Sequence, residues 1–227
     1  MAISLDFTGV LEQWPLFIDG ARLTLELSAV ATIAGFVTGT ACAIAMRAVG
    51  VLARICNAYV EVIRNTPLLV QIFLMYFGLA SLGLHLSAFV VAAVSLTVNV
   101  AAYTAEIMRA GLEAIPAGQI EAGECLGLSR LQLYRYVLLL PAMERVFPAL
   151  ASQFVLLMLA SSVTSQISAE ELTAVANHVQ SETFRPFETF ILLAGLYVAL
   201  SLVMRFGFAA LAFVIFPRRR RLRTSLA

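Results

Sequence analysis

The sequence contains no lysine, only two histidines and little charge of either sign. All 15 of its basic residues are arginine, and charged residues make up 13% of its 227 positions. That is too little charge for the surface of a soluble domain of this length. The three cysteines and two histidines have no metal-ligand spacing, and no G-x-x-x-x-G-K-[ST] phosphate loop occurs. The sequence therefore excludes an ATPase site of its own and predicts no cofactor or metal bound by this chain.

What the sequence does have is long apolar stretches, in a chain that is 61% hydrophobic. About 20 apolar residues are needed to cross a bilayer as a helix. Five stretches meet this requirement, and they are residues 21–46, 58–79, 88–108, 137–160 and 186–216. We therefore expect an all-α polytopic membrane protein with five transmembrane helices. Its parts would be an interfacial segment 1–20, one transmembrane domain 21–217 and a basic tail 218–227.

The arginines predict the orientation of these spans. One side would hold Arg47, Arg54, Arg109, Arg130, Arg135 and the cluster between residues 218 and 223. The opposite side would hold chiefly Arg22 and Arg185. Because cytoplasmic loops carry an excess of basic residues, we expect a periplasmic N-terminus and a cytoplasmic C-terminus. The terminal cluster could also be a patch for lipid or for nucleic acid, but we interpret it as a topology anchor.

A polar segment, residues 110–136, separates the third and fourth spans. Pro116 suits the first turn of a helix, and Gly127 suits the left-handed residue that ends one. Ser129 and Gln132 have the spacing of a capping box for the next helix. The segment therefore predicts a short helix, a tight corner and a second helix that runs toward the membrane.

This segment resembles the signature loop of bacterial ABC importer permeases. Glu121-Ala122-Gly123, Gly127 and Val137 are in register with that pattern, whereas Gly123 replaces an alanine and Leu140-Pro141 comes one residue late. Two further stretches resemble the polar amino-acid branch of the family. They are Arg64-Asn65-Thr66-Pro67-Leu68-Leu69-Val70-Gln71 and Ala102-Tyr103-Thr104-Ala105-Glu106-Ile107-Met108-Arg109.

The resemblance implies the permease subunit of a type I importer for polar amino acids, located in the bacterial inner membrane. Its partners would be a second permease, identical or paralogous, two ATPase subunits that bind ATP and Mg²⁺, and a periplasmic binding protein. A coupling helix would transmit ATPase motion, with small residues at 122 and 123 seated in a groove of the ATPase. The coupling residues implied are Glu121, Ala122, Gly123, Glu124 and Gly127. Two alternatives remain, a secondary carrier and a membrane scaffold or sensor that transports nothing.

Several polar side chains within the spans are candidates for the substrate path. They are Gln71, Asn99, Tyr103, Ser161 and Ser162. For Asn99, a hydrogen bond between helices and a place on the path are equally good explanations. Residues 161–166 would line the outer mouth or, as we prefer, form a solvated turn. Leu159 stands where the family commonly has a lysine.

Other local patterns predict structure without a direct role in transport. Pro67 should kink the second span, and Pro141 is a structural proline near the start of the fourth. Glu61 and Arg64, three residues apart, can pair on one helix face. The small residues Ala31, Gly35, Gly39 and Ala43 recur every fourth position and predict close packing within the chain. Ser168 and Glu171 have the spacing of a capping box for an outer helix, residues 169–178.

Overall fold

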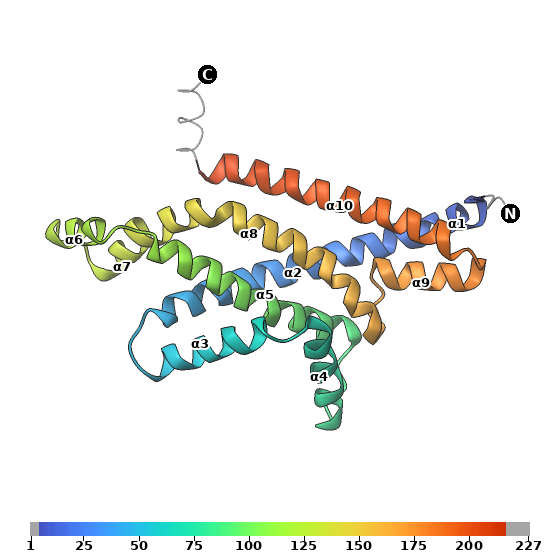
Figure 1. Cartoon of the computed structure of the whole chain (residues 1–227), viewed down its shortest axis with the longest axis horizontal. Coiled ribbons are helices and arrows are strands. Elements are labelled where there is room, and N and C mark those ends of the chain that lie inside the picture. The colour runs from blue at the N-terminus through green and yellow to red at the C-terminus, as the bar shows by residue number, and fades with distance from the viewer. Residues whose placement is uncertain (1–4, 217–227) are drawn as a thin grey trace, which may run out of the picture.

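The structure, a computed structural model, describes residues 5–216, and all of its regular elements are helical. Long helices run along one axis, with α6 and α7 at one end of the molecule and α1 and α9 at the other (Figure 1). The first elements are α1 (Thr8–Glu12), α2 (Trp14–Met46), α3 (Val51–Arg64), α4 (Leu68–Ser81), α5 (Ala88–Glu113) and α6 (Ala117–Cys125). The remaining elements are α7 (Arg130–Gln132), the π-helix η1 (Leu133–Leu139), α8 (Leu140–Ala160), the 3₁₀-helix η2 (Ser161–Ile167), α9 (Leu172–Thr183) and α10 (Pro186–Ile215).

Four helical stretches are long and apolar enough to cross a membrane, and the bent pair α3 and α4 brings the number to five if it counts as one span. The polytopic, all-helical prediction is therefore confirmed. The first span is longer than predicted, because its helix begins at Trp14 and has Pro15 in its first turn. The basic cluster between residues 218 and 223 lies outside the described residues.

α2 and α5 form the centre of the bundle, where small residues let the two backbones approach closely. Ala31, Gly35, Gly39 and Ala43 are all buried on α2. A Cβ atom added to Gly39 would lie 2.5 Å from the carbonyl oxygen of Ala101 and 2.7 Å from Cβ of Thr104. The predicted small-residue ridge thus serves packing within the chain.

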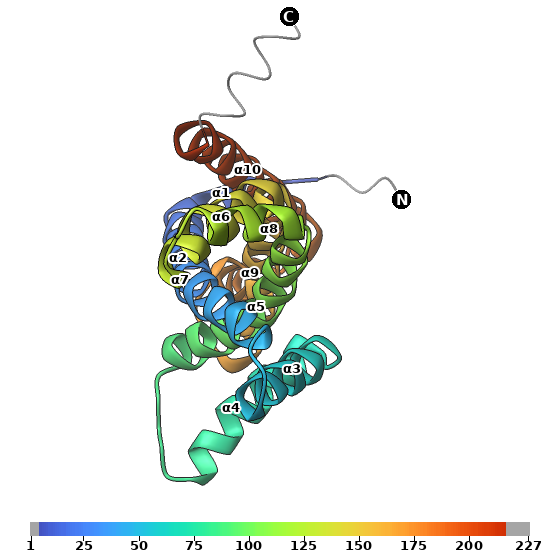
Figure 2. The ribbon, with the colours of Figure 1, turned by 90° about the vertical axis from the view of Figure 1, so that its left-hand side faces the viewer.

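The second span is broken at Pro67, and the break is much larger than a kink. α3 and α4 meet at 109°, so α4 points away from the bundle in Figures 1 and 2. Pro67 has an extended backbone, with φ −63° and ψ 138°. Its missing N–H cannot serve the carbonyl of Ile63, which removes a helical hydrogen bond at this point. The predicted single span from residue 58 to 79 is therefore two helices, the first of which begins at Val51.

The fourth span contains a π-helix directly before α8. The π-helix η1 covers Leu133–Leu139, and Pro141 lies in the first turn of α8. Bonding from residue i to i+5 places one more residue in each hydrogen-bonded turn than the α-helix does. The helical stretch that contains the fourth span runs from Arg130 to Ile167, so it begins before the predicted residue 137.

The outer end of the fourth span differs from the sequence expectation. Residues 161–166 belong to the 3₁₀-helix η2, in which Ser161 and Thr164 are fully buried, so the preferred solvated turn is wrong. Ser168 has a left-handed backbone, φ 62°, and cannot take the extended conformation of an N-cap. The cap of α9 is instead Glu171, whose carboxylate accepts the N–H groups of Thr173 and Ala174. The predicted Ser168–Glu171 capping box is therefore wrong.

Candidate functional site

The corner between α6 and α7 projects from one end of the bundle (Figure 1). Gly127 has φ +73°, and the N–H of Leu128 donates to the carbonyl of Gly123 at 3.1 Å, which closes the end of α6. Ser129 and Gln132 form the predicted capping box, with both reciprocal hydrogen bonds present. Local chemistry alone thus defines the corner, as the sequence predicted.

The residues of this corner divide into an outer and an inner face. Glu121, Ala122 and Glu124 are exposed, and Leu126 is 81% exposed. Gly123 is buried, and a Cβ atom there would lie 2.6 Å from Cδ1 of Leu133. The glycine that replaces the family's alanine therefore packs against the chain's own π-helix, and not outward as we expected.

Two arginines hold the C-terminal end of α5, the helix that directly precedes this corner in the chain. The Nη1 group of Arg47 donates to the carbonyl of Leu112 at 3.2 Å, and Nη1 of Arg145 donates to the carbonyl of Ala114 at 3.1 Å. Cations at a helix C-terminus satisfy its free carbonyls and interact favourably with the helix dipole. The end of α5 is thus tied to the end of α2 and to α8.

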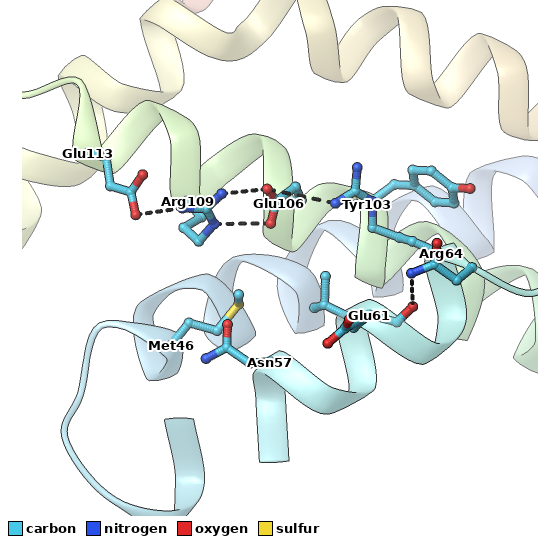
Figure 3. Close-up of a pocket in the computed structure, with 10 residues that line it drawn as sticks. Met46, Asn57, Glu61, Arg64, Tyr103, Glu106, Arg109 and Glu113 are labelled. Carbon is cyan, nitrogen blue, oxygen red and sulfur yellow. Dashed lines mark hydrogen bonds and ion pairs between the residues drawn. The ribbon is translucent and has the colours of Figure 1, made fainter. Parts of the chain in front are cut away.

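A charged chamber of about 640 Å³ lies between α3 and α5, near the same end. Figure 3 shows side chains of both helices facing one another across it. Its charged and polar lining residues are Asn57, Glu61, Arg64, Asn65, Tyr103, Glu106, Arg109 and Glu113. The sequence reasoning named only Tyr103 for the path, but Arg64, Glu106 and Arg109 stand in the two amino-acid-branch motifs. The fold brings these motifs together around one polar hollow.

Ion pairs on α5 organise one wall of the chamber. Arg109 contacts Glu106 through Nη2 at 2.5 Å and Nε at 3.0 Å, and contacts Glu113 through Nη1 at 2.7 Å. Arg64 of α3 lies 3.7 Å from Glu106, and its guanidinium lies 5.6 Å from the centre of the Tyr103 ring. The predicted pair of Glu61 with Arg64 is not formed.

Gln71 and Asn99 lie at the break between α3 and α4, and not in this chamber. Nε2 of Gln71 donates to the carbonyls of Ile63 at 2.8 Å and Thr66 at 3.0 Å, on the two sides of the last turn before the break. Oε1 of Gln71 in turn accepts from Nδ2 of Asn99 at 3.0 Å. Both amides are thus engaged, and the geometry favours the hydrogen bond between helices over a place on the path.

At the opposite end, the outer polar run has its hydroxyls turned inward. Oγ of the fully buried Ser161 donates to the carbonyl of Met158 at 2.7 Å, and Ser162 is half-buried. A hollow of about 720 Å³ lies nearby, between the start of α2, η2 and α9. Its polar lining includes Asp19, Ser165 and Glu170, while Ser161 and Ser162 do not line it.

Comparison with known proteins identifies the family of this chain. Residues 32–220 match the family described as binding-protein-dependent transport system inner membrane component. The chain belongs to this family. It is a multi-pass transmembrane permease subunit of an ABC importer, as the resemblance of the signature loop implied.

Curated relatives of the permease cover most of its length. It is 34% identical to the glutamine transport system permease protein of Escherichia coli strain K12 over 204 residues, which are 88% of this chain and 93% of the relative. It is 31% identical to the arginine transport system permease protein of Bacillus subtilis, covering 90% and 94%. It is 37% identical to the octopine transport system permease protein of Rhizobium meliloti, covering 73% and 71%.

Solved structures share the fold of the permease. A crystal structure of an amino acid ABC transporter with histidines superposes with a TM-score of 0.82 at 35% identity, and the match covers 95% of this chain and 100% of that one. An inward-facing methionine ABC transporter superposes with a TM-score of 0.77 at 22% identity, covering 90% and 98%. The second likeness concerns the fold alone.

Glu171 and Leu172, at the start of α9, join three helices at this end of the permease. Glu171 is fully buried, and its Oε2 accepts from the hydroxyl of Tyr197 on α10 at 2.8 Å. The next residue, Leu172, donates its N–H to Oγ1 of Thr24 on α2 at 3.1 Å. Burial raises the pKa of Glu171, and the hydrogen bonds from Thr173, Tyr197 and Ala174 oppose this shift.

We expect Glu171 to make the stability of the permease depend on pH. A carboxyl with a raised pKa in the folded state favours folding when protonated, and this contribution is lost as pH rises from its unfolded value of about 4.3 through the folded pKa. The melting temperature of the wild type should therefore fall, relative to that of Glu171→Gln, as pH rises through this window. The neighbouring exposed Glu170→Gln is the control for the loss of one carboxyl group at this end of the molecule. A constant difference for Glu171→Gln would contradict the raised pKa.

Proposed function

We propose that this permease imports polar amino acids or closely related compounds, driven by ATP hydrolysis in partner subunits. The observation that carries the cargo class is the match, over about nine-tenths of the chain, to permeases named for glutamine and arginine. The chain itself has no phosphate loop, so ATP and Mg²⁺ would bind to two ATPase subunits. A periplasmic binding protein would deliver the substrate.

The corner at α6 would couple the permease to its ATPase. Glu121, Ala122 and Glu124 are exposed for contact, and the carboxylates complement basic groups on a partner. Gly123 and Gly127 would maintain the shape of the corner. Gly123 would do so by packing on Leu133, and Gly127 by forming the turn. Because Arg47 and Arg145 tie the end of α5 to α2 and α8, a push on α6 would move several helices together.

A second permease subunit, identical or paralogous, would complete the translocation path. α4 stands away from the bundle with Leu74 70% exposed and Phe77 62% exposed, and Ile72 is its sole buried residue. Such an apolar face suits cover by another permease together with membrane lipid. In the bacterial inner membrane, the α6 end would face the cytoplasm and the α9 end the periplasm, because Arg47, Arg130, Arg135 and Arg145 accompany the α6 end.

Uptake into proteoliposomes tests this function. The complex is purified in mild detergent with its copurifying ATPase, reconstituted, and supplied with the binding protein and radiolabelled glutamine or arginine. We expect uptake to require ATP on the side of the ATPase and to persist when ionophores collapse ion gradients. Uptake that follows an ion gradient without ATP would indicate a secondary carrier. Recovery of the ATPase with no uptake of any polar amino acid would indicate a scaffold or sensor.

A further inference from the structure

The chamber between α3 and α5 is not electrically balanced. Three carboxylates line it, those of Glu61, Glu106 and Glu113, against the two guanidinium groups of Arg64 and Arg109. Arg109 is fully engaged by the two glutamates of its own helix. The net negative charge is contributed by α5, but the carboxylate without an ionic partner is on α3, where Glu61 is exposed to the hollow and forms no ion pair with any residue that the structure describes.

Arg64 is the complementary group with unused hydrogen-bonding capacity. Its one ionic contact, to Glu106, is long at 3.7 Å, and its side chain is 40% exposed. The guanidinium lies over the ring of Tyr103, which fixes its position and leaves N–H donors at its edge. A planar guanidinium with free donors is suited to a carboxylate, which it can bind through two parallel hydrogen bonds.

Glu61 and Arg64 are spaced to bind the two ends of one small molecule. Residues three apart on a helix are neighbours, with Cβ atoms about 5–6 Å apart. Both belong to the α3 wall of the hollow in Figure 3, yet they do not pair with each other. An α-amino acid carries its ammonium and its carboxylate on a single carbon, so its head group can reach both side chains at once. The ammonium would meet Glu61 and the carboxylate would meet Arg64.

We propose that this chamber is a binding subsite for the zwitterionic head group of an α-amino acid, with Glu61 holding the ammonium and Arg64 the carboxylate. The inference rests on the proposed amino-acid cargo. A volume of about 640 Å³ is within the range of small-molecule sites and leaves room for a side chain beyond the head group. Since the contacts involve only the head group, the subsite would accept side chains of different chemistry.

The subsite would lie toward the exit of the proposed path. Glu106 is seven residues before Glu113, the last residue of α5, which corresponds to about 10 Å along the helix. In the proposed orientation this places the chamber in the cytoplasmic part of the span. A substrate released from the outer half would bind there before leaving, with its charges matched by protein groups and water.

Head-group derivatives test the proposal on the purified permease–ATPase complex in lipid nanodiscs, without the binding protein. The probes are L-glutamine, L-arginine, L-argininamide, which lacks the carboxylate, and Nα-acetyl-L-arginine, which lacks the ammonium. Saturation-transfer NMR and calorimetry measure their affinities. We expect the wild type to bind both amino acids at least about tenfold more tightly than either derivative, which corresponds to about 1.4 kcal/mol.

Substitutions assign each half of the head group. Glu61→Gln should remove the preference for L-arginine over Nα-acetyl-L-arginine, and Arg64→Gln should remove the preference over L-argininamide. Arg64→Lys should keep part of the preference for a free carboxylate. Lysine retains the positive charge but lacks the planar guanidinium that forms two parallel hydrogen bonds. Glu26→Gln is the matched control, since Glu26 pairs with Arg22 on α2 outside the chamber. Melting temperatures verify that each variant is folded, and Glu61, exposed and unpaired, is expected to tolerate its change.

Uptake by the same preparations separates this proposal from the proposed function. If wild-type complexes take up amino acids with ATP but bind no zwitterion at the chamber, the subsite is refuted and the importer function stands. Unchanged preferences in Glu61→Gln and Arg64→Gln would refute it equally. Loss of ATP-driven uptake in the wild type itself would refute the importer function, whatever the binding data.

Discussion

Gly127→Val is expected to abolish ATP-driven uptake, whereas Gly127→Asn should retain most of it. Gly127 has φ +73°, which a β-branched residue adopts only with strain of about 1–3 kcal/mol, while asparagine tolerates it. At 1.4 kcal/mol for each factor of ten, this strain lowers the equilibrium constant for forming the native corner by about 5- to 140-fold. No atom lies within 4 Å of a Cβ atom added there, so the backbone conformation and not a steric clash decides the outcome.

The measurement is a comparison of uptake and of ATPase copurification for the two variants. Valine and asparagine at an exposed position differ little in size, so a defect in both would indicate that the ATPase contacts this residue directly. Full activity of Gly127→Val would refute the account of the corner, because it would mean that α6 need not end in this turn. The capping box at Ser129 is unchanged in either variant and keeps the start of α7 intact.

Gly39→Leu is expected to prevent recovery of folded permease. A Cβ atom alone would lie 2.5 Å from the backbone oxygen of Ala101, and backbone cannot rotate away as a side chain can. Overpacking of a close interface costs about 1–3 kcal/mol even for small additions, so Gly39→Ala should fold with a lowered melting temperature. The larger leucine would force α2 from α5, the two helices at the centre of the bundle.

Gly207→Leu is the matched control, because Gly207 lies on α10 with no atom within 4 Å of an added Cβ atom. This variant should fold, and Gly207→Ala should gain about 0.5–1 kcal/mol from the better helix former. Size-exclusion profiles and melting temperatures in detergent measure both series. Equal recovery and equal melting temperatures for Gly39→Leu and Gly207→Leu would contradict the close approach of α2 and α5 at Gly39.

The sequence predicted the turns and caps correctly at the α6 end of the permease and incorrectly at the α9 end. At the α6 end, the turn at Gly127 and the cap at Ser129 followed from residues within four positions of one another, and the structure has both. At the α9 end, the capping-box spacing predicted Ser168 as the N-cap of the outer helix, whereas in the structure the N-cap of α9 is Glu171. Hydrogen bonds with Tyr197 of α10 and Thr24 of α2 hold this cap in place, and no local pattern contains that information.

The sequence by itself determined the long apolar helices and the turn between α6 and α7, because hydrophobic length and turn chemistry are local properties. The fold alone decided which polar groups meet. Gln71 forms a hydrogen bond with Asn99, 28 residues away in the sequence, and Arg64 approaches Glu106, which is 42 residues away. The periodicity of the sequence predicts which helix face such residues lie on, but not which other helix packs against that face. The packing of α3 beside α5 creates the chamber and with it the candidate subsite.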